Sequence, residues 1–208
     1  MKHQAYQELK KLVLGGALPN DEVRTVRDLA GSLQFSEITV FAAVEMLEQE
    51  GLVRFATPTG IAVRDTSALD VRHRFEIRMV FEPFVVHRLA GELMPHQIAI
   101  LLDLMQQYRE LMPNGPCLEL AEADFEFHKS LCEFFGNDEI VRVMRQLKDR
   151  ALPVILRALR RCPDRIDATE IEHTAILEAL VAGDRDGAQR AMTEHLQRGV
   201  KVLLGTEP

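Results

Sequence analysis

The sequence predicts a mostly α-helical protein in two parts: a small part with two short strands, and a larger, entirely helical part. Three observations support this prediction. The 208 residues are 47% hydrophobic, which is enough for a core. Strand-like stretches occur once, on either side of a Pro/Gly turn. Beyond that hairpin, apolar residues recur at helical spacing. The predicted boundaries are 1–65 for the first part, 66–69 for a polar hinge and 70–208 for the helical part.

The first part begins with two predicted helices. Residues 4–14 form the first, which two glycines end, and LPND at 18–21 forms a turn. Thr25 is a suitable N-cap for a second, short helix over 25–33, because its hydroxyl can accept a hydrogen bond from a backbone N–H of the first turn.

A third helix and a hairpin follow. Ser36 is the predicted N-cap of this helix and Gly51 ends it. Its inward-facing stripe consists of Val40, Ala43, Val44 and Leu47. The stretches LVRFA (52–56) and IAVRD (61–65) are then predicted as two strands. Helix, helix, turn, helix and hairpin is the element order of a winged helix-turn-helix domain.

The second part is predicted to be a bundle of six helices. Pro and Gly cluster at the breaks between them. The predicted ranges are 70–92, 95–111, 117–135, 138–161, 167–182 and 185–204. Pro153 lies inside the fourth range, where it predicts a kink or a break.

Charge, apolar content and cysteine spacing argue against a basic protein, a membrane protein and a protein held together by disulfides. The net charge is −7, divided as −2 in residues 1–65 and −5 in the remainder, so neither part is basic. The sequence has no run of eighteen apolar residues and no signal-peptide pattern, so we expect a soluble, cytoplasmic protein without a membrane partner. The cysteines lack CxxC spacing and are predicted to be buried or half-buried thiols. They are Cys117, Cys132 and Cys162.

Two histidines of the helical part are placed at equal distances from a turn. His173 lies eleven residues before Asp184, the predicted N-cap of the last helix, and His195 lies eleven residues after it. At about 1.5 Å of rise per residue, each lies ~16 Å from the turn of an antiparallel helix pair. The spacing therefore predicts two imidazoles facing each other across one seam.

A third helix adds a carboxylate and another imidazole to this seam. Asp124 and His128 lie one turn apart on an apolar stripe. Three imidazoles and a carboxylate suit Zn²⁺, with Ni, Mn or Fe as alternatives, and a bound dication would offset the cost of burying the carboxylate. The alternative is an ordinary Asp124–His128 contact among hydrogen-bonded core histidines. The remaining histidines are predicted to lie at the surface or in packing positions: His3, His73, His87 and His96.

Nearly the whole chain resembles one known family. PNDEVRTVRDLAGSLQFSEITVFAAVEMLEQEGLV, with the later TPTGIAV, resembles the winged-helix domain of GntR-type bacterial transcription regulators. The second half resembles the helical effector domain of their FadR branch, called FCD. The matching segments are FEIRMVFEP (75–83), DFEFH (124–128), EH (172–173) and GDRDGAQRAMTEHL (183–196). Six helices rather than seven resemble the VanR-type subgroup.

The resemblance implies a homodimer that binds palindromic operator DNA and holds a small organic acid effector against a divalent metal ion. The implied metal ligands are Asp124, His128, His173 and His195. Arg78 matches an arginine that contacts anionic effectors in relatives. From the residues alone, Arg78 can instead pair with Glu82 at the i,i+4 spacing of a helix.

The predicted recognition helix departs from the family. Glu37 and Phe41 stand where relatives usually carry arginines, and no Lys or Arg occurs from Asp28 through Val53. DNA-binding proteins usually contact phosphates through such cations. The remaining candidates for DNA contact are Arg24, Arg27 and Arg54 toward phosphates, Ser36 and Thr39 on the helix, and Thr59 and Gly60 at the tip of the wing.

Three functions remain open from the sequence. The first is a ligand-responsive, DNA-binding transcription regulator. The second is a metal- and carboxylate-binding sensor with weakened or lost operator binding, acting through protein contacts. The third is a metal-dependent hydrolase, because a metal with open positions can activate water. Against the hydrolase, the sequence shows no second inward-facing acid to act as a general base and no GxSxG motif.

Overall fold

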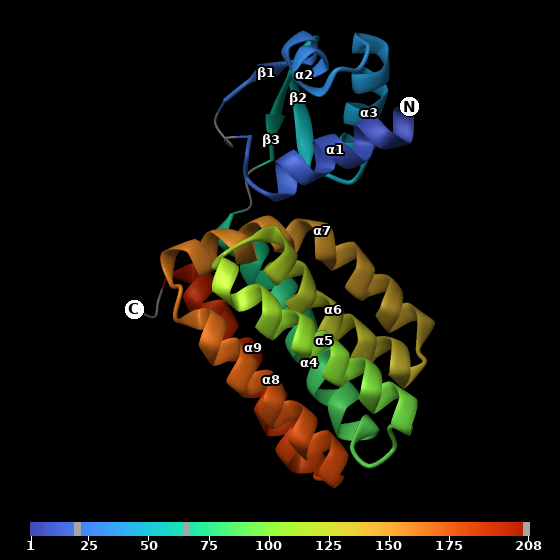
Figure 1. The fold of residues 1–208 in the computed structure, drawn as a ribbon, viewed down its shortest axis with the longest axis vertical. Coiled ribbons are helices and arrows are strands. Elements are labelled where there is room, and N and C mark those ends of the chain that lie inside the picture. The colour runs from blue at the N-terminus through green and yellow to red at the C-terminus, as the bar shows by residue number, and fades with distance from the viewer. Residues whose placement is uncertain (19–21, 65–66, 206–208) are drawn as a thin grey trace. The chain divides into compact units, whose positions relative to one another are not determined.

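The computed structural model describes residues 1–18, 22–64 and 67–205 (Figure 1). The chain divides into two compact units, Met1–Thr66 and Ser67–Pro208. Most of the turn predicted at 18–21, the end of the strand predicted at 61–65 and the first residue of the hinge predicted at 66–69 lie outside the described residues.

The first unit is a winged helix-turn-helix. Its elements are α1 (Lys2–Leu14), β1 (Arg24–Thr25), α2 (Val26–Leu33), α3 (Glu37–Gln49), β2 (Val53–Thr57) and β3 (Gly60–Val63). The strands form an antiparallel sheet in the order β1-β3-β2. The hairpin of β2 and β3 was predicted from sequence; β1 was not, because two residues are too few to show an alternating pattern.

Local hydrogen bonds explain where α2 and α3 begin. The Thr25 hydroxyl accepts from the backbone N–H of Asp28 at 3.1 Å, and the Ser36 hydroxyl accepts from that of Thr39 at 3.2 Å. Both predicted N-caps are therefore confirmed. The predicted inward stripe of α3 is also confirmed, because all four of its side chains are fully buried.

The second unit consists of the six predicted helices and one 3-10 turn. Their bounds are α4 (Ala68–Leu89), α5 (Pro95–Leu111), η1 (Met112–Asn114), α6 (Leu118–Phe135), α7 (Asp138–Arg161), α8 (Arg165–Ala182) and α9 (Arg185–Leu204). Helix α4 begins inside the predicted hinge, because Ser67 and Asp70 form a capping box. Of the kink or break predicted at Pro153, the break does not occur. Helix α7 continues through it, held by the buried neighbours Leu152 and Val154.

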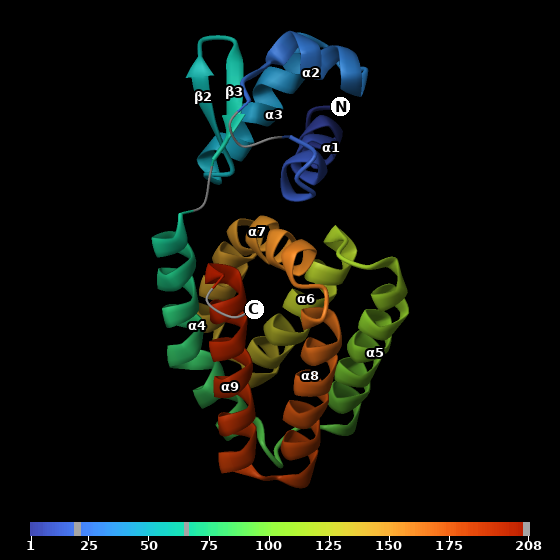
Figure 2. The ribbon, with the colours of Figure 1, turned by 90° about the vertical axis from the view of Figure 1, so that its left-hand side faces the viewer.

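The helices of the second unit pack around a shared apolar core. Helix α9 packs against both α4 and α8, while α6 packs against α4, α5 and α7 (Figure 2). Helices α4, α6, α8 and α9 thus surround one interior, where Phe127, Leu131, Ile176 and Met192 are almost completely buried. Across the described part of the chain, no helix combines the length and the apolar character needed to cross a membrane.

Two glycines join the ends of α4 and α8 by direct backbone contact. Gly91 and Gly183 both have positive φ, at +78° and +73°, and a Cβ built on Gly91 would lie 3.4 Å from the Cα of Gly183. The backbone N–H of Gly91 also donates to the carbonyl of Leu180 at 2.9 Å. Glycine is favoured at both positions because other residues rarely adopt this backbone conformation.

Candidate functional site

Four side chains from three helices converge in the interior of the helical unit. Asp124 and His128 come from α6, His173 from α8 and His195 from α9. One ligand atom from each lies within 4.8 Å of the others. The three histidines are buried and Asp124 is half-buried. The predicted juxtaposition of His173 and His195 is confirmed, since their ring centres are 4.7 Å apart.

The three imidazoles present the same nitrogen to a common centre. The Nε2 atom of His128 lies 3.1 Å from Nε2 of His195 and 3.2 Å from Nε2 of His173. Asp124 Oδ1 lies 3.5 Å from Nε2 of His173. Two imidazole nitrogens bound to one Zn²⁺ at about 2.0–2.1 Å, with ligand angles of roughly 90–110°, would be separated by roughly 2.9–3.4 Å. The observed spacing fits one ion coordinated by several imidazoles.

A buried carboxylate on α4 orients His128. Glu82 Oε2 lies 2.6 Å from Nδ1 of His128, and the same carboxylate accepts from the guanidinium of Arg78. Arg78 and Glu82 are each 2% exposed. Burial alone would raise the pKa of Glu82, but the neighbouring Arg78 and His128 lower it to about 2. The ionised carboxylate is therefore suited to accept a hydrogen bond from an Nδ1–H of His128.

His195 is oriented by a second carboxylate in the same way. Glu172 Oε2 lies 2.7 Å from Nδ1 of His195. Arg165 donates two hydrogen bonds to this carboxylate, at 2.6 and 2.7 Å, and Arg198 donates a third at 3.0 Å. Burial would raise the pKa of Glu172, but hydrogen bonds from His195 and Arg165 outweigh it and lower the pKa to about 2. Each of these two imidazoles is thus held between a carboxylate and the common centre.

The protons on Nδ1 leave lone pairs on Nε2. With Nδ1 donating to Glu82 and Glu172, the Nε2 atoms of His128 and His195 are both acceptors. In that tautomer the two Nε2 atoms, 3.1 Å apart, both direct a lone pair toward the common centre. A cation at the centre of the three rings would accept these lone pairs, which are what a metal ion requires.

The remaining electrostatics also favour neutral imidazoles. Burial lowers the pKa of His173 well below its usual value, and the neighbouring His195 and His128 lower it further. Burial also lowers the pKa of His195 to about 4, despite its hydrogen bond to Glu172. Phe127 stacks on His173 with ring centres 4.3 Å apart and fixes its plane. At neutral pH these rings are therefore uncharged, which is the form that binds metals.

Sequence reasoning missed Arg165 and Glu172, and it named Glu82 only as a possible partner of Arg78. The expectation that no second acid faces inward is wrong, because Glu82 and Glu172 are both buried beside the histidines. Glu172 adjoins His173 in sequence, so a single-stripe helical pattern places it off the buried face. The i,i+4 pair of Arg78 with Glu82, left open by the sequence, is present. It lies in the core rather than on the surface.

A small cavity adjoins the four converging side chains. Its volume is about 50 Å³, room for a few water-sized groups. Its polar lining consists of Arg78, Asp124, Arg165, Thr169 and His195. The rest of its wall is formed by Phe75, Ile155, Ala158, Leu159, Gly199, Val202 and Leu203. The cavity lining therefore combines two guanidinium groups and one of the imidazoles with a largely apolar wall.

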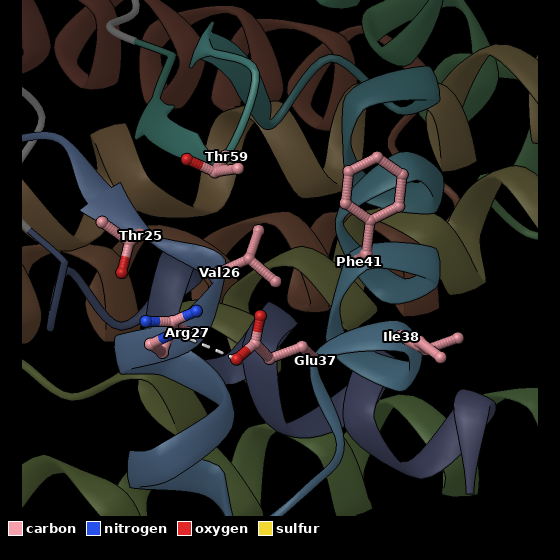
Figure 3. Close-up of a pocket in the computed structure, with 7 residues that line it drawn as sticks. All are labelled: Thr25, Val26, Arg27, Glu37, Ile38, Phe41 and Thr59. Carbon is pink, nitrogen blue, oxygen red and sulfur yellow. Dashed lines mark hydrogen bonds and ion pairs between the residues drawn. The ribbon is translucent and has the colours of Figure 1, made fainter.

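In the winged unit, the predicted phosphate contacts differ in their surroundings. Arg27 Nε donates to Glu37 Oε1 at 3.1 Å, so this arginine shares its charge with an acid at the start of α3 (Figure 3). Arg24 similarly donates to Glu22 at 3.2 Å. Arg54 is exposed on β2. Two of the three predicted cations are thus neutralised by a neighbouring carboxylate.

The other predicted DNA contacts lie at the start of α3 and in the turn between β2 and β3. The hydroxyls of Ser36 and Thr39 lie 2.8 Å apart, and the Ser36 hydroxyl also caps α3 by accepting from the backbone N–H of Thr39. Thr59 is exposed, and its carbonyl accepts from the backbone N–H of Val26. Gly60 is buried, and a Cβ there would come within 2.7 Å of Val23. Several of the predicted DNA contacts therefore also take part in the hydrogen bonding and packing of the domain itself.

The residues left outside the candidate site lie where the sequence predicts. The three cysteines are free thiols, one buried and two half-buried. His3, His73 and His96 are exposed, and His87 is partly exposed, 3.7 Å from Asp186.

Comparison with known proteins agrees with both units. The family model described as the FCD domain matches residues 73–198. The HTH-type transcriptional regulator YdhC of Bacillus subtilis is 24% identical over 202 residues, covering 96% of this chain and 89% of that protein. LutR, an HTH-type transcriptional regulator of the same species, is 26% identical over 212 residues, covering 92% of this chain and 95% of LutR.

Solved structures share the fold over the full length. McbR/YncC of E. coli superimposes with a TM-score of 0.80 at 20% identity, covering 100% of this chain and 98% of that one. A GntR transcriptional regulator from Rhodococcus sp. RHA1 gives a TM-score of 0.78 at 21% identity, covering 100% and 99%. With the FCD match extending over more than half of the sequence, the chain belongs to the FCD-domain family, within the GntR class of transcription regulators.

Proposed function

We propose that this regulator binds operator DNA as a homodimer and responds to a small carboxylate held beside a divalent metal ion. The observation that carries the proposal is the convergence of three Nε2 atoms, two of them with their Nδ1 protons held by the buried carboxylates Glu82 and Glu172. Metal-binding histidines commonly donate their second ring N–H to a carboxylate.

The ligands we propose for the metal are Asp124, His128, His173 and His195. This donor set favours Zn²⁺, with Ni, Mn or Fe as alternatives. A bound ion would supply the positive charge and the open positions that attract a carboxylate oxygen. The low pKa of His173 and His195 supports binding at neutral pH, because no proton has to leave these rings.

The cavity beside these ligands supports a carboxylate effector. Arg78 and Arg165 line it from α4 and α8, and both also hold the carboxylates that orient the histidines. Guanidinium groups bind carboxylates with directed, charge-assisted hydrogen bonds. We therefore assign Arg78, as the family resemblance implies, and Arg165 as anchors of the effector anion.

The apolar wall narrows the class of effector. Ile155, Leu159 and Val202 offer no hydrogen-bonding side chain, so hydroxyl groups of a sugar acid placed against them would lose their water partners. The volume of about 50 Å³ also favours a small molecule. We propose a carboxylate with two to four carbons and a short aliphatic tail that faces this wall.

Regulation then follows from unequal binding to two conformations. The effector anion contacts groups on α4 and α8 and draws these helices toward α6 and α9. Only a difference in affinity between the two conformations can shift their populations. Helix α4 is continuous in sequence with the winged unit, so a change in α4 reaches the DNA-binding part through the chain.

The proposed homodimer is tested by light scattering, which should give twice the mass of one chain.

The metal is tested on the purified full-length protein by elemental analysis and thermal unfolding. We expect about one divalent ion per chain and a fall in Tm on addition of a chelator, because a ligand that binds only the folded state stabilises it. Re-addition of Zn²⁺ should restore the Tm. A His173→Ala variant should lose this response, whereas His96→Ala, an exposed control, should keep it. No bound metal and no response to chelator would exclude the metal site.

The effector is tested by the same thermal measurement on the Zn²⁺-loaded protein. We expect propionate or butyrate to raise the Tm, and gluconate at equal concentration to have no effect. Leu159→Ala enlarges the cavity and should shift the preference to longer acids, while Leu102→Ala, an exposed control on α5, should not. A response to gluconate alone would overturn the aliphatic assignment and leave the metal site standing.

One observation favours the second candidate, a sensor with weakened or lost operator binding. Helix α3 carries no cation, and Arg27 is neutralised by Glu37. If the protein binds a carboxylate but enriches no sequence from a random pool of duplex DNA, with or without that acid, this candidate replaces operator binding.

A further inference from the structure

The start of α3 exposes two large apolar side chains. Ile38 is 83% exposed and Phe41 39% exposed. The Phe41 ring lies 5.2 Å from that of Phe55 on β2, which holds it in place at the surface. Both residues line a groove of about 520 Å³ between the start of α2, the start of α3 and the β2–β3 turn, to which Thr25 and Thr59 also contribute.

The polar groups beside this apolar surface already have partners. Glu37 accepts from Arg27, and Figure 3 shows Glu37 pointing toward Arg27 while Ile38 points away from this pair. The hydroxyls of Ser36 and Thr39 lie 2.8 Å apart in the helix cap. Ile38 is therefore the most exposed apolar side chain at the start of α3, the part of the helix that would enter a major groove first.

The major groove offers one apolar group for such a side chain. Each base pair presents hydrogen-bond donors and acceptors there, and thymine adds the C5-methyl group. An aliphatic side chain against any other base edge would remove water from a donor or acceptor without replacing its hydrogen bond. Contact with a methyl group removes apolar surface from water on both sides.

We propose that Ile38, with Phe41 beside it, recognises thymine methyl groups in the operator. The inference rests on DNA binding by the winged unit and names the chemical feature that this unit reads. Glu37 contributes by engaging Arg27 and by disfavouring phosphates close to the start of α3. The operator half-site should then carry one or two thymines whose methyl groups face the start of α3.

The test removes the methyl group from the DNA and the side chain from the protein. A high-affinity site is first selected from random duplex DNA with the full-length, Zn²⁺-loaded protein. Each thymine is then replaced by deoxyuridine, which pairs identically but lacks the C5-methyl group, and binding is measured by fluorescence anisotropy at fixed salt. At one or two positions per half-site, we expect deoxyuridine to weaken binding roughly three- to tenfold.

The protein variants identify the contact. Ile38→Ala should bind the thymine and deoxyuridine sites equally, while Ile100→Ala, an exposed isoleucine on α5, should keep the wild-type difference. If deoxyuridine has no effect at any position of a selected site, or Ile38→Ala keeps the full difference, the inference is wrong although DNA binding stands. If no sequence is selected, operator binding itself fails, and the inference fails with it.

Discussion

Each unit of this protein contains an Arg–Glu pair at its candidate site, and the two pairs differ in burial. The side chains of Arg78 and Glu82 are 3% and 2% exposed, whereas those of Arg27 and Glu37 are 83% and 55% exposed. A buried pair cannot lose one partner without leaving a charge in a low-dielectric core. An exposed pair is screened by water and contributes little to stability. We therefore expect the same two groups to stabilise the fold in one unit and, in the other, to affect DNA binding with little effect on stability.

The largest expected effect comes from breaking the buried pair. Glu82→Leu leaves Arg78 buried without its partner and should lower the free energy of unfolding by roughly 3–5 kcal/mol. Urea unfolding followed by circular dichroism, on protein treated with a chelator, measures this change without a contribution from bound metal.

A double variant sharpens that test. Arg78→Met combined with Glu82→Leu removes both charges and should recover part of the lost stability, because apolar residues of similar volume often replace buried ion pairs without loss. The recovery should be incomplete, because Nδ1 of His128 still lacks its partner. A cost of less than about 1 kcal/mol for Glu82→Leu alone would mean that this pair behaves like an exposed one.

A smaller effect is expected at the other buried carboxylate. Glu172→Gln keeps the size of the side chain but removes the charge that holds the Nδ1 proton of His195, so metal affinity should fall about ten- to hundredfold. Competition with a chromophoric zinc chelator measures the affinity. Glu194→Gln, which alters an exposed acid bonded to Arg198, should leave it unchanged. Equal affinity in both variants would show that Glu172 does not orient the ligand.

The smallest effect is expected at the exposed pair, and on DNA rather than on folding. Glu37→Gln should change the free energy of unfolding by less than about 1 kcal/mol. By releasing Arg27 to contact a phosphate, it should steepen the slope of log K against log salt concentration by about 0.9. Anisotropy titrations at several salt concentrations measure the slope. Glu92→Gln, in the exposed pair with Arg185, serves as the control. An unchanged slope would mean that Glu37 does not restrain Arg27.

The sequence predicted the fold and the converging side chains because both depend on periodicity. Helical spacing placed His128 on an inward stripe, and equal distances from Asp184 brought His173 and His195 together. Periodicity did not reveal Glu82 or Glu172, because α4 carries charged residues on several faces and only packing decides which face is buried. The strand β1 escaped prediction for a different reason, since its two residues pair with β3 through tertiary contact alone.

The backbone contact between Gly91 and Gly183 has a mechanical consequence. It joins the C-terminal end of α4 to that of α8, so we expect this end of the bundle to move least when an anion binds. Phe75 and Arg78, which line the cavity, lie in the half of α4 farther from it. We expect a displacement caused by a bound anion to grow along α4 away from Gly91. This displacement would then be greatest at Ser67, the residue from which the chain leads back to the DNA-binding unit.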